Sequence, residues 1–182
     1  MYFEKRGAEN TEITLQIARD EALKRGIKNI VVASTTGETG LQAAQLLKDD
    51  PLNLVIVGHS TGHREVGLQQ MDKEKKAEME KLGATVFLGT DVLTGFPMGV
   101  LQRNRFTHEN WIADTLRMFG QGTKVAVEIV AMASDADLLP VEDVIAVAGS
   151  GKGADTCLVI GANSTNQFFD IKVREVLAKP KD

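Results

Sequence analysis

Residues 29–40 read NIVVASTTGETG, and this stretch decides the fold we predict. Its first part is short, β-branched and apolar throughout, which is typical of a strand buried on both faces of a parallel sheet. Its second part is rich in glycine, serine and threonine and leads into an expected helix over residues 39–48. A strand, a polar loop and a helix in this order form the repeating unit of α/β proteins, so we expect that class here.

The same alternation continues along the chain. Further strands are predicted at residues 54–57, 84–88, 124–132, 144–148 and 156–160, with a last edge strand at 171–177. Further helices are predicted at residues 11–24, 72–82 and 107–119, and the connection 89–106 is long enough to be a functional lid. We therefore predict one domain, residues 1–182, built as a three-layer, doubly wound, mostly parallel sheet. The strand-rich final third leaves room for an antiparallel strand at one edge.

Composition narrows the functional classes. The chain has 182 residues, of which 43% are hydrophobic and 25% charged, and this is ordinary for a globular protein. A net charge of −4 without a dense basic stripe argues against a nucleic-acid partner. No apolar stretch reaches the roughly 20 residues of a membrane span, and the amino terminus lacks a signal-peptide pattern. We therefore expect a cytoplasmic location and no membrane partner. We also expect Cys157 to be buried, and the composition is compatible with a homo-oligomer.

Two loops carry the chemistry that the sequence suggests. Residues 34–40 follow the first predicted strand, and residues 149–156 (GSGKGADT) follow the strand at 144–148. Backbone N–H groups and hydroxyls at the carboxyl end of a strand, followed by a helix start, are suited to a phosphate group. An ordinary helix-capping turn is the alternative interpretation of the first loop. If both loops lie at one edge of the sheet, they can close on one ligand.

The second loop does not fit a nucleoside-triphosphate site. Lys152 follows Gly151 as in a Walker loop, but that pattern needs serine or threonine next and a glycine five positions earlier. Gly153 and Ala146 occupy those places. The G-x-G-x-x-G pattern of dinucleotide sites is also absent after the first strand, which argues against NAD.

The histidines and aspartates give weaker indications. His59 and His63 are four residues apart in a glycine-containing loop, and no Cys, Asp or Glu set with metal spacing accompanies them, so the sequence favours no metal. His59 directly follows a strand, so it is either a ligand contact or a solvated loop histidine. Asp135 and Asp137 can contact a sugar hydroxyl or form a plain turn. Asp155 can bind a ribityl hydroxyl or fix its own loop.

Two stretches resemble a known domain. Residues 29–57 are similar to the start of the carboxyl-terminal domain of pyruvate kinase, and residues 144–156 are similar to its last glycine-rich segment. In pyruvate kinases these loops hold the phosphates of a sugar-bisphosphate effector, away from the catalytic site. The catalytic barrel has no counterpart here, so kinase activity is not implied. A non-catalytic sensor of a phosphorylated metabolite is the function that this likeness suggests.

The whole chain also resembles a family of small stand-alone archaeal and bacterial proteins of this same fold. The residues that carry this resemblance are 10–12, 31–34, 125–133, 153–156 and 168–170. Members of that family are associated with bound flavin mononucleotide (FMN). The resemblance implies FMN as the cofactor, with its phosphate at residues 34–39 and the rest between residues 58–62 and the second loop. It implies no particular reaction, although flavin chemistry is often redox.

FMN also needs an apolar wall for its ring system, and Met132, Phe96 or Phe168 can supply one. Trp111 lies in a helical pattern that we expect to face the core. The predicted ligand-binding residues are Ser34, Thr35, Thr36, Gly37, Glu38, Thr39, Gly58, His59, Thr61, Gly62, Met132, Gly149, Ser150, Gly151, Gly153, Ala154, Asp155 and Thr156. The sequence assigns no catalytic residue.

Overall fold

The computed structural model describes residues 1–95 and 107–181, which form a mixed α/β fold around a seven-stranded sheet. The strands are β1 (Tyr2–Phe3), β2 (Asn29–Ala33), β3 (Asn53–His59), β4 (Thr85–Gly89), β5 (Asp143–Ala148), β6 (Thr156–Gly161) and β7 (Lys172–Pro180). They lie in the order β1-β7-β6-β5-β2-β3-β4. The helices are α1 (Thr11–Arg25), α2 (Glu38–Leu47), α3 (Lys73–Lys81), α5 (His108–Arg117) and α6 (Gln121–Asp135), with short 3₁₀ turns η1 (Ala8–Asn10) and η2 (Thr165–Asp170).

The sheet is mostly parallel, as predicted. β2 pairs in parallel with β3 and β5, and β3 pairs in parallel with β4. The antiparallel part lies toward the other side of the sheet, where β6 runs antiparallel to both β5 and β7. The carboxyl ends of β2, β3, β4 and β5 therefore meet along one edge, where the loops that follow them lie close together.

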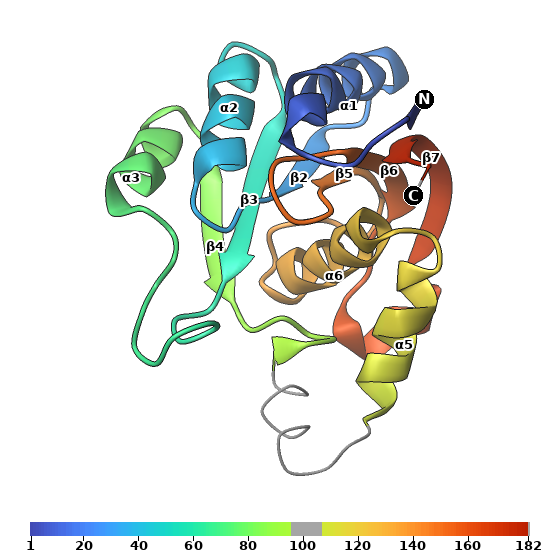
Figure 1. The fold of residues 1–182 in the computed structure, drawn as a ribbon. Helices are drawn as coiled ribbons and strands as arrows, with labels where there is room; N and C mark the ends of the chain where they lie inside the picture. The colour runs from blue at the N-terminus through green and yellow to red at the C-terminus, as the bar shows by residue number, and fades with distance from the viewer. Residues whose placement is uncertain (96–106, 182) are drawn as a thin grey trace.

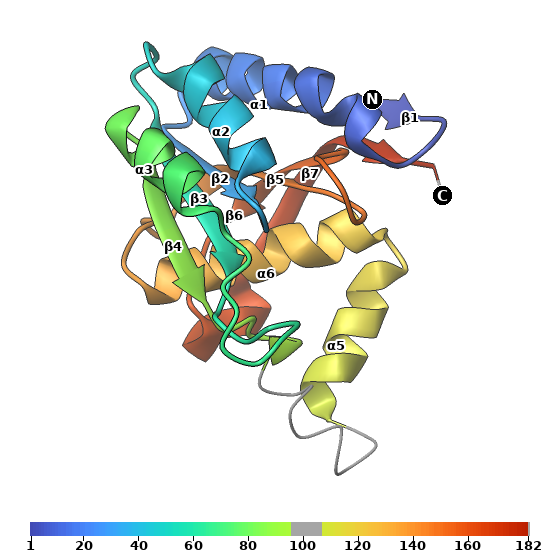
Figure 2. The ribbon, with the colours of Figure 1, turned by 60° about the vertical axis from the view of Figure 1, so that its left-hand side comes forward.

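Helices cover both faces of the sheet, which gives the three expected layers (Figures 1 and 2). Ile30 and Val32 of β2 belong to the core cluster that includes residues of α1 and α2, whereas Val31 belongs to the cluster that includes α6. All three side chains have no exposed surface. This two-sided burial explains why the strand is apolar at every position instead of alternating.

The strand predicted at residues 124–132 is wrong, because this segment belongs to helix α6. Eleven of the fifteen residues of α6 are buried, since the helix packs against the sheet on one side and against α5 on another. A helix buried on nearly every side needs few polar residues. Residues 125–133 contain Glu128 as their single charged residue, so they resemble the apolar run of a buried strand. Of the turn expected at residues 134–137, residues 134 and 135 consequently end α6, and residues 136 and 137 form the turn that follows it.

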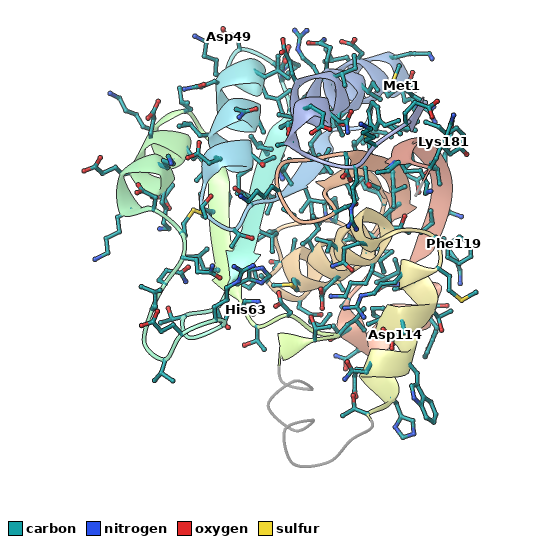
Figure 3. All side chains as sticks on the ribbon, in the orientation of Figure 1. Met1, Asp49, His63, Asp114, Phe119 and Lys181 are labelled. Atoms are coloured by element: carbon teal, nitrogen blue, oxygen red, sulfur yellow. The ribbon has the colours of Figure 1, made fainter. Side chains whose placement is uncertain are left out.

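The two chain ends meet at one corner of the molecule. β1 pairs in parallel with the end of β7, and Figure 3 places Met1 close to Lys181. Cys157 is fully buried, as expected, and this burial raises the pKa of its thiol. Within residues 1–95 and 107–181, no helix has the length and apolar character that crossing a membrane requires.

Candidate functional site

The first loop presents the start of α2. Gly37 is the N-cap of this helix, with a left-handed φ of 99°, and as a glycine it has no side chain that could cap the helix. The first N–H groups of a helix have no partner within it, and they carry the positive end of its dipole. The Ser34 hydroxyl accepts a hydrogen bond from the Gly40 N–H at 3.1 Å, which holds the loop against the helix. This geometry suits a negatively charged group at the start of α2.

Asp155 holds the second loop in place. Its carboxylate is fully buried and accepts hydrogen bonds from the N–H groups of Gly7 at 3.1 Å and Ser150 at 3.3 Å. It also accepts from the hydroxyls of Ser150 at 3.2 Å and Thr156 at 2.9 Å. With these four donors, Asp155 fixes its own loop, which was one of the two roles considered for it from the sequence.

Two glycines allow the second loop to fold back on itself. A Cβ at Gly149 would lie 2.1 Å from the carbonyl oxygen of Gly153, so the loop closes only with glycine there. Gly153 has a φ of 69°, and a Cβ on it would lie 2.3 Å from Oγ1 of Thr11. That Thr11 hydroxyl oxygen accepts a hydrogen bond from the Ala154 N–H at 3.0 Å. The second loop is therefore docked on the start of α1.

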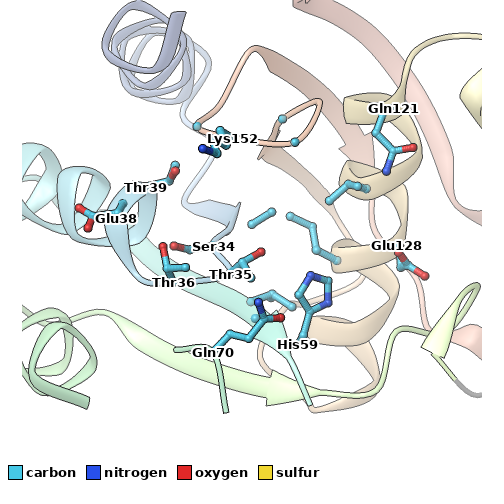
Figure 4. Close-up of a pocket in the computed structure, with 18 of the residues that line it drawn as sticks. Ser34, Thr35, Thr36, Glu38, Thr39, His59, Gln70, Gln121, Glu128 and Lys152 are labelled. Carbon is cyan, nitrogen blue, oxygen red and sulfur yellow. The ribbon is translucent and has the colours of Figure 1, made fainter. Parts of the chain in front are cut away.

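Both loops line one cavity of about 700 Å³. Figure 4 shows the labelled residues of the first loop on one side of it, Lys152 above, His59 below, and Gln121 and Glu128 on α6 on the opposite side. The cavity lies where β2, β3 and β5 end. The sequence-predicted residues that line it are Ser34, Thr35, Thr36, Glu38, Thr39, Gly58, His59, Gly149, Gly151 and Gly153.

The other predicted residues lie outside this lining. They are Gly37, Thr61, Gly62, Met132, Ser150, Ala154, Asp155 and Thr156. Gly37 lies close to α3, because a Cβ there would lie 3.0 Å from Cβ of Lys75. Met132 is only 2% exposed and packs in the core between α6 and the sheet.

The apolar part of the cavity wall comes from other residues than those suggested by the sequence. Ala33, Val57, Val125 and Ile129 line it. Phe168 lies instead in a separate apolar groove formed with residues of α5, α6 and β7, and Phe96 lies outside the described residues.

A buried ion pair on α6, which the sequence analysis missed, faces the cavity. Lys124 and Glu128 form a salt bridge, and their side chains are 3% and 4% exposed. The Lys124 ammonium also donates to the hydroxyl of Thr94 at 3.0 Å. Glu128 accepts a hydrogen bond from the N–H of Leu93 at 2.8 Å. Opposite charges four residues apart in an apolar run were the sequence signal for this helical pair.

His59, His63 and Asp91 form a second polar cluster in the cavity wall. His59 ends β3, His63 lies in the following loop, and Asp91 lies just after β4, the neighbouring strand. Nδ1 of His59 lies 2.9 Å and Nδ1 of His63 lies 3.3 Å from Oδ2 of Asp91. The two imidazole rings are stacked, with centroids 3.8 Å apart. Figure 3 shows His63 beside the carboxyl ends of β3 and β4.

Burial and neighbouring charges shift the pKa of His63 in this cluster. Asp91 is 5% exposed, and it is the carboxylate that both histidines approach. The pKa of His63 lies below its usual value, chiefly because burial penalises the imidazolium and secondly because of the charge of His59. His63 is therefore held in its neutral form over a wider pH range than a free histidine.

Two further expectations about side chains are corrected. Trp111 does not face the core, since it is 59% exposed on α5. Asp135 does not follow a strand, because it is the last residue of helix α6. Its carboxylate accepts hydrogen bonds from the N–H and the hydroxyl of Thr165, each at 2.8 Å.

No family model matches the chain. A search of solved structures finds a similarity to the crystal structure of O-ureido-L-serine synthase, at 18% sequence identity and a TM-score of 0.33. The similar region covers 60% of this chain and 29% of the synthase chain, so this chain corresponds to less than a third of that enzyme. The likeness to the pyruvate kinase domain and to FMN-associated proteins stays a prediction.

Proposed function

We propose that the cavity binds a phosphorylated small molecule, and that FMN is the leading candidate. The observation that supports this proposal is the meeting of the two hydroxyl- and glycine-rich loops on one cavity at the carboxyl ends of parallel strands. Ligands of open α/β sheets bind at this edge. A volume of about 700 Å³ is within the range of small-molecule sites.

The residues around the cavity match the parts of such a ligand. The start of α2, the hydroxyls of Thr35 and Thr36, and the cation of Lys152 favour the phosphate. Gln70 and Gln121 offer amide groups for hydroxyls, and the four apolar wall residues named above favour a flat ring. When FMN is bound, it supplies redox chemistry of its own, while the protein binds and orients it.

The first test is the absorbance spectrum of the protein as purified, followed by titration of the protein with FMN. We expect flavin bands or uptake of one FMN per chain. FMN at about 100 times its dissociation constant stabilises the folded state by about 2.7 kcal/mol, which raises the melting temperature by roughly 5–10 °C. If the protein is colourless and is stabilised by sugar phosphates but not by FMN, the ligand is a phosphorylated metabolite other than FMN. Stabilisation by neither would overturn the proposal.

A charge variant tests the place of the phosphate. Thr36 is exposed at the cavity, so Thr36→Glu brings a carboxylate to the phosphate without disturbing the core. Like charges about 4 Å apart repel by about 4 kcal/mol at an effective dielectric constant of 20, so we expect FMN affinity to fall by more than about tenfold. Thr85→Glu adds the same charge at the exposed start of β4, far from the carboxyl ends, and should bind normally. If Thr36→Glu and Thr85→Glu bind FMN with equal affinity, the phosphate does not bind near Thr36.

A further inference from the structure

The cluster of His59, His63 and Asp91 brings together three side chains that commonly bind transition metals. One ring nitrogen from each histidine and one carboxylate oxygen of Asp91 all lie within 4.8 Å of one another. Asp91 comes from a different part of the chain, and only the pairing of β3 with β4 places it beside the histidines. Two imidazoles and one carboxylate are an established ligand set for Zn²⁺.

The separations of the two Nδ1 atoms from Oδ2 of Asp91 are close to those in a coordination shell, although the contact with His59 is now a hydrogen bond that metal binding would replace. Metal–ligand distances of about 2.0–2.1 Å in a tetrahedral site place neighbouring ligand atoms about 3.3 Å apart. Oδ2 of Asp91 lies 2.9 Å from Nδ1 of His59 and 3.3 Å from Nδ1 of His63. The carboxylate of Asp91 is buried, so water competes little with a metal for its oxygens. Both imidazoles are partly exposed, and both line the cavity.

The histidine rings need one adjustment to bind a metal. The rings are nearly parallel, with an angle of 6° between their planes. A metal lies close to the plane of each imidazole that binds it, so one ring must turn out of the stack. His63 lies in the loop between β3 and α3, outside regular secondary structure, whereas His59 is fixed at the end of β3. His63 is therefore the ring that turns.

We propose that His59, His63 and Asp91 bind one divalent transition-metal ion, for which Zn²⁺ is the matching probe. All three residues line the cavity, so the coordination positions that they leave open face the bound small molecule. Three protein ligands with an open position are typical of catalytic zinc sites, in which the metal polarises an oxygen of the ligand or of water. The metal site rests on these three side chains alone and does not depend on FMN.

The test is calorimetric titration of Zn²⁺ into the full chain after treatment with a chelator. We expect one ion per chain, and a loss of affinity of at least about tenfold in His59→Gln and in His63→Gln, since even outer-shell changes cost 10–100-fold. His108→Gln is the matched control, because His108 is exposed on α5 beside Trp111. Absence of Zn²⁺ binding to the wild type, or equal binding by all three variants, would overturn the site.

A second measurement does not depend on the folding of variants. X-ray absorption at the zinc edge of the wild-type protein should show two imidazole ligands with the remaining ligands oxygen. A spectrum without imidazole contributions would overturn the proposal. Both experiments use flavin-free protein, so failure of the metal site leaves the FMN test unaffected, and failure of FMN binding leaves the metal test unaffected.

Discussion

Lys124 and Glu128 form an ion pair within one turn of α6, and both side chains are almost completely buried. The pair also connects α6 to the segment after β4, because Glu128 accepts the N–H of Leu93 and Lys124 donates to Thr94. Asp91 lies in that same segment. The pair therefore helps to hold one wall of the cavity.

Breaking this pair should destabilise the protein strongly. Lys124→Met leaves the Glu128 carboxylate buried without a counter-charge, and Glu128→Gln leaves the ammonium in the same position. Removing one partner of a buried pair costs about 3–5 kcal/mol. We expect this loss in the free energy of unfolding for each single variant, measured by urea denaturation. The double variant should lose less than the sum of the two.

The matched control is the exposed pair Lys76 and Glu80 on α3, which has the same i, i+4 spacing. Lys76→Met and Glu80→Gln should each change the free energy of unfolding by less than about 1 kcal/mol, because exposed pairs contribute little. Single substitutions at Lys124 or Glu128 that cost no more than these would show that the pair does not stabilise the cavity wall.

The sequence was sufficient to predict most elements, and α6 shows where it was not. β2 is short, and glycine and polar residues lie on both sides of it in the sequence. Ile30 and Val32 face one side of the sheet and Val31 faces the other, so the pattern fits only a strand. α6 has the same apolar character over a longer run. Its type depends on what surrounds it, and the pattern alone does not contain that information.

The candidate site also has one part that could be predicted from the sequence and one part that could not. The two loops could be predicted because local composition, such as the glycines in residues 149–153, determines their conformation. The histidine cluster could not, because Asp91 is 32 residues from His59 in sequence. It reaches His59 only because β3 and β4 are neighbours in the sheet. Sequence spacing alone therefore does not reveal the three-residue cluster that the sheet order brings together.

Gly149→Ala should open the second loop. The new Cβ would lie 2.1 Å from the Gly153 carbonyl oxygen, which belongs to the backbone and cannot turn away. Overpacking of this kind costs about 1–3 kcal/mol. We expect a lower melting temperature and faster proteolytic cleavage between residues 149 and 155.

Gly26→Asn provides the comparison for that variant. Gly26 also has a positive φ, 70°, but a Cβ there meets no atom within 4 Å. Asparagine tolerates this conformation at the end of a helix, so we expect a smaller loss of stability and no new cleavage. Equal effects of the two substitutions would mean that the contact of Gly149 with Gly153 does not limit the loop.

Arg19 and Asp50 should make stability depend on acid pH. Nε and Nη2 of Arg19 donate to the two carboxylate oxygens of Asp50 at 2.6 and 2.9 Å, which joins α1 to the turn that follows α2. This hydrogen bonding, and secondarily the positive charge, holds the pKa of Asp50 below its usual value. A carboxyl with a lowered pKa in the folded state contributes stability above its unfolded pKa of about 3.9, and this contribution is lost as pH falls through the folded pKa.

Asp50→Asn should therefore lower the free energy of unfolding at pH 7, and the difference from wild type should shrink below about pH 4. Urea denaturation at several pH values between about 2 and 7 measures both quantities. The neighbouring exposed Asp49, labelled in Figure 3, gives the control Asp49→Asn, which should leave this pH dependence unchanged. A difference between Asp50→Asn and wild type that stays constant down to the lowest pH would contradict the role of the carboxylate charge, because protonation of Asp50 would then not remove the stabilisation that the substitution removes.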